Sequence, residues 1–342
     1  MGAKQELPAL IDQYQISSGM QHFNPDTVAR TAREIILSRF RNTFDFYSPF
    51  EIPVDRKIIE EKNWSIIHFR ERSKALGLEL RDPLVLYIDY NKLIEEKGSL
   101  IAPGIEQVST TGGLSIGPII VVAVHPKELR LSTTATTHHE LAHYYSLTQF
   151  HVLGLPSPII YLRNGAKVDT HEGITKGTIF EEGFAFHDEE IYINTRGRKR
   201  FPLDHLQLYL ALPFAVEAGH GSRYLSTFNI TGRRLLKLDF DTDIHHSDDF
   251  IDIYRGLSQR IPSFTQILER ARATGSWNGL GKLIDDYYGS GAFRMLMSFH
   301  YENLPFSILQ STLKFVKKEI TLNELGVVVA IEENKQQQKT TL

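Results

Sequence analysis

The stretch of sequence that organises this chain reads TTATTHHELAHYYSLTQF, at residues 133–150. Neither proline nor glycine occurs in it, and the next glycine is Gly154. Ser132 or Thr133 stands where a helix cap is expected, because a side-chain hydroxyl there can accept from the first free backbone N–H groups. The pattern therefore predicts one helix that extends from Thr133 to Phe150.

Within this helix, His139, Glu140 and His143 form the pattern H-E-x-x-H. Residues four apart lie on one face of a helix, so both imidazoles are expected to reach one metal ion, with Glu140 beside them as a base for a metal-bound water. Zinc suits such a site because it accepts imidazole and carboxylate ligands and keeps a position open for water. His138 points about 100° away around the helix and is expected to bond a neighbouring polar group instead.

The residues before the motif predict helices and a small sheet. Helices are expected over Pro25–Thr43 and over Asp55–Leu76, the second ending at Gly77. Two apolar runs rich in β-branched residues, Leu84–Tyr90 and Ile119–Val124, predict strands.

The residues after the motif predict an irregular connection and then mostly helices. Glycines and prolines are frequent up to Gly177, around one short apolar segment, Ile159–Leu162. A helix is expected to resume at Thr178 and to extend to about Ile193. Further helical spacing occurs at Leu206–Glu217, Phe264–Ala273, Leu280–Tyr288 and Ala292–Tyr301.

These elements predict an α+β protein with three parts. The first, residues 1–150, is a mixed α/β N-terminal lobe that ends in the motif helix. The second, residues 151–331, is a mainly helical C-terminal lobe. A polar tail, residues 332–342, is expected to be mobile.

Composition excludes several other classes of protein. A formal charge of -3 argues against a nucleic-acid partner, and the basic run Arg196–Arg200 is expected to be a solvated loop. The longest apolar stretch, Pro118–Val124, is too short to cross a membrane, and no signal-peptide run is evident, so a cytoplasmic protein is the default expectation. The absence of cysteine restricts any metal site to imidazole and carboxylate ligands.

A second segment, FEEGFAFHDE at residues 180–189, gives the motif a family context. H-E-x-x-H followed by a helix with Glu-Gly-aromatic-Ala resembles the gluzincin metallopeptidases, which have a zincin-like fold and hydrolyse peptide bonds with one zinc ion per chain. The resemblance implies that Glu182 is the third ligand and that Glu189 is the further glutamate that such families carry seven residues on. The small Gly183 would let this helix approach the motif helix closely.

Other ligand assignments stay open. Glu181 is adjacent to Glu182 and could exchange roles with it, and Glu172 lies in the preceding connection. An extended metzincin pattern is excluded, because it would need glycine and histidine where this chain has Ser146 and Gln149.

The resemblance also suggests supporting residues. Gluzincins commonly use a Tyr or His to stabilise the oxyanion, and Tyr288 is the first choice among Tyr287, Tyr288, His220 and Tyr224. Glu189 would either hydrogen-bond a ligand histidine or bind the amino group of a substrate. These enzymes often align a peptide on the edge strand beside the metal helix, but the unbroken apolar run Ile119–Val124 favours an interior strand.

The sequence thus predicts zinc-dependent hydrolysis of peptides or proteins. A second hypothesis is a non-catalytic regulatory or interaction protein stabilised by zinc. A third is a metal-dependent hydrolase or oxygenase that acts on another small molecule. Glu140 favours an enzyme, because a structural zinc site needs no general base.

Overall fold

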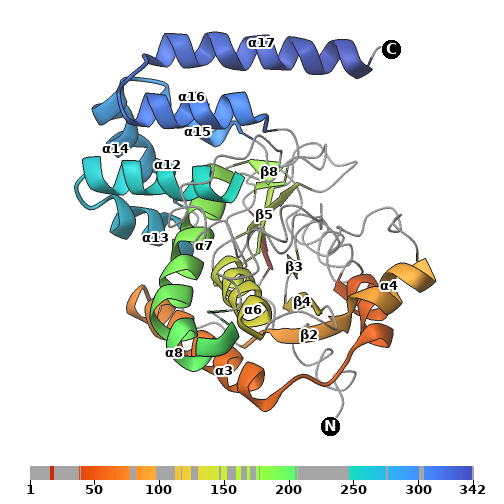
Figure 1. Cartoon of the computed structure of the whole chain (residues 1–342). Coiled ribbons are helices and arrows are strands. Elements are labelled where there is room, and N and C mark those ends of the chain that lie inside the picture. The colour runs from red at the N-terminus through yellow and green to blue at the C-terminus, as the bar shows by residue number, and fades with distance from the viewer. Residues whose placement is uncertain are drawn as a thin grey trace.

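The computed structural model describes residues 16–18, 38, 40–77, 82–97, 112–116, 118–124, 130–145, 148–151, 159–162, 168–169, 175–176, 178–204, 206, 246–274, 276–299 and 304–340. The helices are α3 (Arg56–Ala75), α4 (Tyr90–Lys97), α6 (Arg130–Tyr144), α7 (Thr178–Tyr192), α8 (Arg198–Arg200), α12 (His246–Arg260), α13 (Phe264–Thr274), α14 (Asn278–Tyr288), α15 (Ala292–Met297), α16 (Phe306–Val316) and α17 (Leu322–Thr340), with a 3-10 turn at Ser48–Phe50 and a π-helical turn at Ile193–Gly197. The strands are β1 (Ile16–Ser18), β2 (Leu84–Asp89), β3 (Gly113–Ile116), β4 (Ile119–Val124), β5 (Thr148–His151), β6 (Ile159–Leu162), β7 (Val168–Asp169) and β8 (Thr175–Lys176). The predicted α+β class is therefore confirmed (Figure 1).

A three-stranded mixed sheet, in the order β2-β4-β3, packs against helix α6. Strand β4 pairs in parallel with β2 and antiparallel with β3. Its residues are almost all buried, as expected for an apolar strand covered on both faces, so the prediction of an interior strand at Ile119–Val124 is confirmed. Among the described strands of this sheet, β3 has a neighbour on one side only.

The predicted irregular connection after the motif contains strands. Strands β5, β6, β7 and β8 belong, with β1, to a second sheet of order β1-β6-β5-β7-β8. The short apolar segment Ile159–Leu162 is β6, and it pairs antiparallel with β5. The predictions for Glu172, His220 and Tyr224 lie outside the described residues.

Helix α6, which carries the motif, is central (Figure 1). It packs on β3 and β4 and lies between α3 and α7. Its predicted bounds were wrong at both ends. It begins at Arg130, where the distant Asp204 caps it by accepting a hydrogen bond of 3.2 Å from the backbone N–H of Leu131. It ends at Tyr144, because Thr148 already belongs to strand β5.

The helices on either side of α6 follow the sequence closely. Helix α3 begins after Asp55, whose carboxylate accepts from the backbone N–H of Lys57 at 2.7 Å, and it ends before Gly77, which has a φ of 80°. Helix α7 begins at Thr178, as predicted, and ends one residue before Ile193.

The basic run Arg196–Arg200 is helical, so the prediction of a solvated loop was wrong. The guanidinium of Arg196 donates to both carboxylate oxygens of buried Glu61, at 2.6 and 3.0 Å, and Arg200 pairs with Glu60. Buried carboxylates are stable only when paired, so these arginines have a structural role that the sequence did not indicate.

Helix α12 packs on α7, α16 packs on α12, and α17 lies along the outside of α16 (Figure 1). One hydrophobic core contains Ile66 of α3, Ile120 of β4, Leu141 of α6, Phe184 of α7 and Leu257 of α12. This core includes side chains from both sides of residue 150. The division into two lobes stays a prediction.

The predicted polar tail from residue 332 lies within α17. Glutamine, glutamate and lysine favour helices, so a polar composition is compatible with this continuation. Within the described part of the chain, no helix combines the length and the apolar content needed to cross a membrane.

Candidate metal centre

Helices α6 and α7 bring three of the predicted ligand side chains together. His139 Nε2 and His143 Nε2 lie 3.0 Å apart. One carboxylate oxygen of Glu182, Oε2, lies 3.3 Å from the first nitrogen and 3.5 Å from the second. All three residues are buried, and they form one of two groups in the described residues that could hold a metal ion.

The spacing of these three atoms fits zinc. In a tetrahedral shell with bonds of about 2.0–2.1 Å, neighbouring ligand atoms lie about 3.3 Å apart. The three measured separations, 3.0, 3.3 and 3.5 Å, bracket that value. Two imidazole nitrogens and a carboxylate oxygen that face one point repel each other unless a proton or a cation lies between them, so the donor set itself indicates a cation site.

Glu189 orients the first histidine. Its Oε2 lies 3.1 Å from His139 Nδ1, within hydrogen-bonding distance. When Nδ1 donates to this carboxylate, the lone pair of Nε2 is left to face the metal position. The prediction that Glu189 hydrogen-bonds a ligand histidine is thus supported over the alternative that it binds a substrate amine.

The rival ligand Glu181 has a different partner. Arg272 of α13 donates to both oxygens of Glu181, at 2.9 and 3.0 Å, and also to the backbone carbonyl of Ala142, at 2.8 Å. Glu181 Oε2 lies 3.7 Å from His143 Nδ1, which is an electrostatic contact on the side of the ring away from the metal position. The geometry therefore favours Glu182 as the ligand and gives Glu181 a supporting position.

The charges around these three ligand atoms favour a cation. Burial alone would lower the pKa of His139, but hydrogen bonds to Glu182 and Glu189 outweigh burial and raise this pKa to about 10. Burial alone would raise the pKa of Glu182, but His143 and His139 hold it well below its usual range. The negative charges that shift these pKa values also favour a metal cation between the three ligand atoms.

The Glu140 side chain, next to His139 in the chain, lies against strand β3. It is buried, and it packs directly over Gly113 of strand β3. A Cβ atom at Gly113 would lie only 2.7 Å from Glu140 Oε1 and 2.6 Å from its Cγ. The absence of a side chain at position 113 therefore makes the space that the Glu140 carboxylate occupies.

Known proteins give no further guidance. No protein-family model matches the chain, and no match was found among curated proteins or solved structures.

The predicted oxyanion donor Tyr288 lies elsewhere in the fold. Its hydroxyl donates to the backbone carbonyl of Val316 at 2.8 Å, and its ring packs on Phe315, with the centroids 5.0 Å apart. These contacts join α14 to α16. Tyr287 stacks under Lys318, whose ammonium lies 3.9 Å from the ring centroid. Both tyrosines therefore have structural contacts, and neither is brought to the metal-ligand group.

The sequence predicted the supporting role of Glu189 but not the partner of His138 or the role of Arg272. It correctly expected His138 to bond a polar neighbour, and the structure identifies that neighbour as Asp188, at 3.1 Å. The pairs His138–Asp188 and His139–Glu189 are both separated by 50 residues. The adjacent His-His and Asp-Glu dipeptides were the available signal. No comparable signal pointed to Arg272.

Proposed function

We propose that this chain is a zinc-dependent hydrolase that cleaves peptide bonds. His139, His143 and Glu182 would hold the zinc ion, and Glu140 would act as the general base. The observation that carries the proposal is the convergence of two imidazole nitrogens and one carboxylate oxygen, 3.0–3.5 Å apart, together with a second buried carboxylate, that of Glu140, adjacent to His139 in the chain. A purely structural zinc site has four protein ligands and no need for such a carboxylate.

The chemistry divides between the ion and the chain. Zinc supplies Lewis acidity, which polarises a carbonyl group and lowers the pKa of a water molecule to about 7. Glu140 accepts a proton from the attacking water and returns it to the leaving amine. Glu189 keeps His139 in the required tautomer, and Arg272 offsets the charge of Glu181 beside the ligand carboxylate.

In the proposed enzyme, the substrate would bind along strand β3. This strand forms one edge of the described three-stranded sheet, and its first residue, Gly113, lies against Glu140. An extended peptide that added to this edge would place its backbone beside the base. The resemblance to the gluzincins implies the same use of an edge strand.

Cleavage of a mixed peptide library tests the proposed function. Protein loaded with one equivalent of zinc is expected to produce new peptide termini, and a chelator should abolish them. Re-adding zinc should restore cleavage. Zinc binding without any cleavage would contradict the peptidase and favour a non-catalytic role, while the absence of zinc binding would contradict the whole proposal.

The variant Gly113→Ala tests the position of the base. The added methyl group would displace the flexible Glu140 side chain, so we expect kcat to fall by about 10-fold or more, as for other displaced catalytic groups. Zinc content should stay unchanged, because the three atoms nearest to the added methyl group all belong to Glu140, which is not in the ligand group. The control is Gly279→Ala, where the nearest atom is 3.9 Å away. Unchanged turnover in Gly113→Ala would show that Glu140 need not occupy this position.

A further inference from the structure

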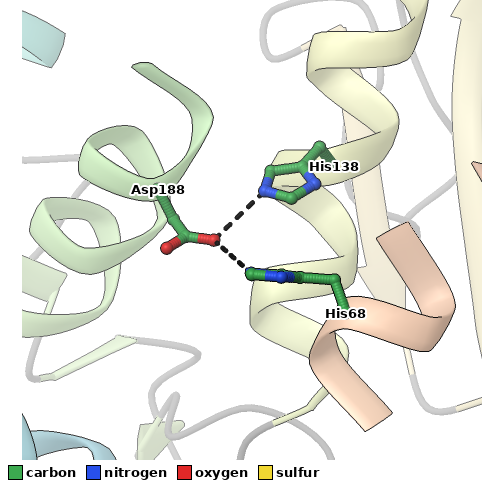
Figure 2. A group of neighbouring side chains, drawn as sticks. All are labelled: His68, His138 and Asp188. Carbon is green, nitrogen blue, oxygen red and sulfur yellow. Dashed lines mark hydrogen bonds and ion pairs between the residues drawn. The ribbon is translucent and has the colours of Figure 1, made fainter. Parts of the chain in front are cut away.

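A second cluster of metal-ligand side chains lies beside the first, on the opposite side of α6 from the strands. Figure 2 shows His68 of α3 and His138 of α6 pointing toward one carboxylate oxygen of Asp188 of α7. His138 Nε2 lies 3.1 Å from Asp188 Oδ2, and His68 Nε2 lies 3.5 Å from the same oxygen. The three ligand atoms all lie within 4.8 Å of one another.

The two buried members of this cluster are held in place. Ser65 Oγ lies 2.9 Å from His138 Nδ1, so the ring is fixed with Nε2 toward Asp188. Arg72 donates to the other oxygen of Asp188, Oδ1, at 2.7 Å. Asp188 Oδ2 therefore remains directed at both histidines. Preorganised ligands lower the cost of ordering a site when an ion binds.

Arg72 limits the affinity of this cluster but does not block it. It pairs with both Asp188 and Glu269, so these three ionised groups sum to one negative charge. Its contact with His68 Nε2 is long, 3.3 Å, and can give way while both ion pairs persist. The first metal centre has the carboxylates of Glu182 and Glu189 against its two imidazoles. The second cluster should therefore bind a cation more weakly.

Access from solvent also differs between the two clusters. The His68 side chain is 33% exposed, whereas His138 is buried. An ion can therefore reach the second cluster directly from the surface and bind the exposed imidazole first. The residues of the first centre are all buried.

We propose that His68, His138 and Asp188 form a second binding site for a divalent transition-metal ion such as zinc. Two imidazoles and one carboxylate suit zinc, cobalt or nickel and disfavour magnesium and calcium, which prefer oxygen ligands. Because His138 adjoins His139, and Asp188 adjoins Glu189, an ion at this site would fasten α3 to the same helix pair that carries the first metal centre.

Trp64 provides a reporter for the second site. Its ring stacks on His68, with centroids 5.1 Å apart, and on His138, at 5.9 Å. The chain contains one other tryptophan, Trp277, which packs on Phe180. In a Trp277→Phe background, the remaining fluorescence reports on the surroundings of Trp64.

The experiment is a zinc titration of chelator-treated Trp277→Phe protein in a metal-buffered solution, with fluorescence and bound metal measured together. We expect two zinc ions per chain at saturation, the weaker of which changes the Trp64 emission. At the zinc concentration that just saturates the parent, His68→Gln should bind one zinc ion. The midpoint of its fluorescence change should move to a more than about 100-fold higher zinc concentration, because losing a ligand has a larger effect than the about 10–100-fold effect of losing a ligand's hydrogen-bond partner. Cobalt absorption would identify the ligand field independently of any catalytic activity.

Two matched variants make the outcome decisive. Glu96→Gln removes an exposed carboxylate of α4 that pairs with Lys92 and belongs to neither ligand group, and it should keep both ions. Glu182→Gln should lose the tighter ion and keep the Trp64 response. The proposal is overturned if His68→Gln still binds two ions, or if the Trp64 response is identical in the parent and in His68→Gln. Failure of the peptidase proposal alone would leave both of these measurements unaffected.

Discussion

Glu140→Gln is expected to abolish most peptide hydrolysis while leaving the zinc content unchanged. Glutamine has nearly the same shape as glutamate but cannot accept the proton of the attacking water, and the loss of a general base typically lowers kcat by about 10²–10⁴-fold. Glu140 is not in the group of converging ligand atoms, so zinc should remain bound. Turnover of a library-derived peptide and metal analysis of the same sample measure both effects.

The control for this variant is Glu96→Gln on α4, which removes an exposed carboxylate paired with Lys92 at 3.7 Å. It should match the parent in both measurements. If Glu140→Gln retained full turnover, another group would have to be the base. If it lost zinc, Glu140 would be acting as a ligand, and the assignment of Glu182 would have to be reconsidered.

Glu182→Gln is expected to impair zinc binding, whereas Glu181→Gln is expected to impair folding stability. Glu182→Gln should weaken zinc binding at the first centre by more than about 100-fold, because it removes a direct ligand. Glu181→Gln should retain zinc, but it removes the charged carboxylate that accepts two hydrogen bonds from the buried guanidinium of Arg272. Breaking a buried ion pair from one side typically costs about 3–5 kcal/mol of folding stability.

Competition with a chromogenic chelator measures the zinc affinity, and urea unfolding of the metal-free proteins measures the stability. The two neighbouring, isosteric substitutions serve as controls for each other. The assignment of the third ligand would be reversed if Glu181→Gln lost zinc while Glu182→Gln retained it. Equal effects of both substitutions on zinc would indicate that the carboxylates share the ion.

Elements with a strong local signal were predicted from the sequence within one or two residues. Helix α3 has a capping aspartate at Asp55 and a glycine at Gly77, and both ends were found where expected. Helix α6 was misjudged because its capping group, Asp204, comes from a distant part of the chain. Its C-terminal end was misjudged because Thr148 pairs in a sheet, which no local pattern indicated.

The same distinction applies to the candidate site. His139 and His143 could be paired from the sequence because they lie one helical turn apart. The assignment of Glu182 as the third ligand came from a family resemblance. Its preference over Glu181 depends on Arg272, which is 91 residues away from Glu181. His68 of the second cluster lies in α3, which is also distant in the sequence from α6 and α7. Partners that depend on tertiary packing leave no periodic signal, so these contacts had to come from the structure.

The late position of Arg272 in the chain affects the order in which the helices can pack during synthesis. A nascent chain exposes α7 before residue 272 has left the ribosome. At that stage Arg272 cannot yet donate to Glu181, so the burial of this carboxylate and of the adjacent Glu182 beside α6 costs more free energy. If His139, His143 and Glu182 hold zinc as proposed, we expect its capture to follow the synthesis of α13.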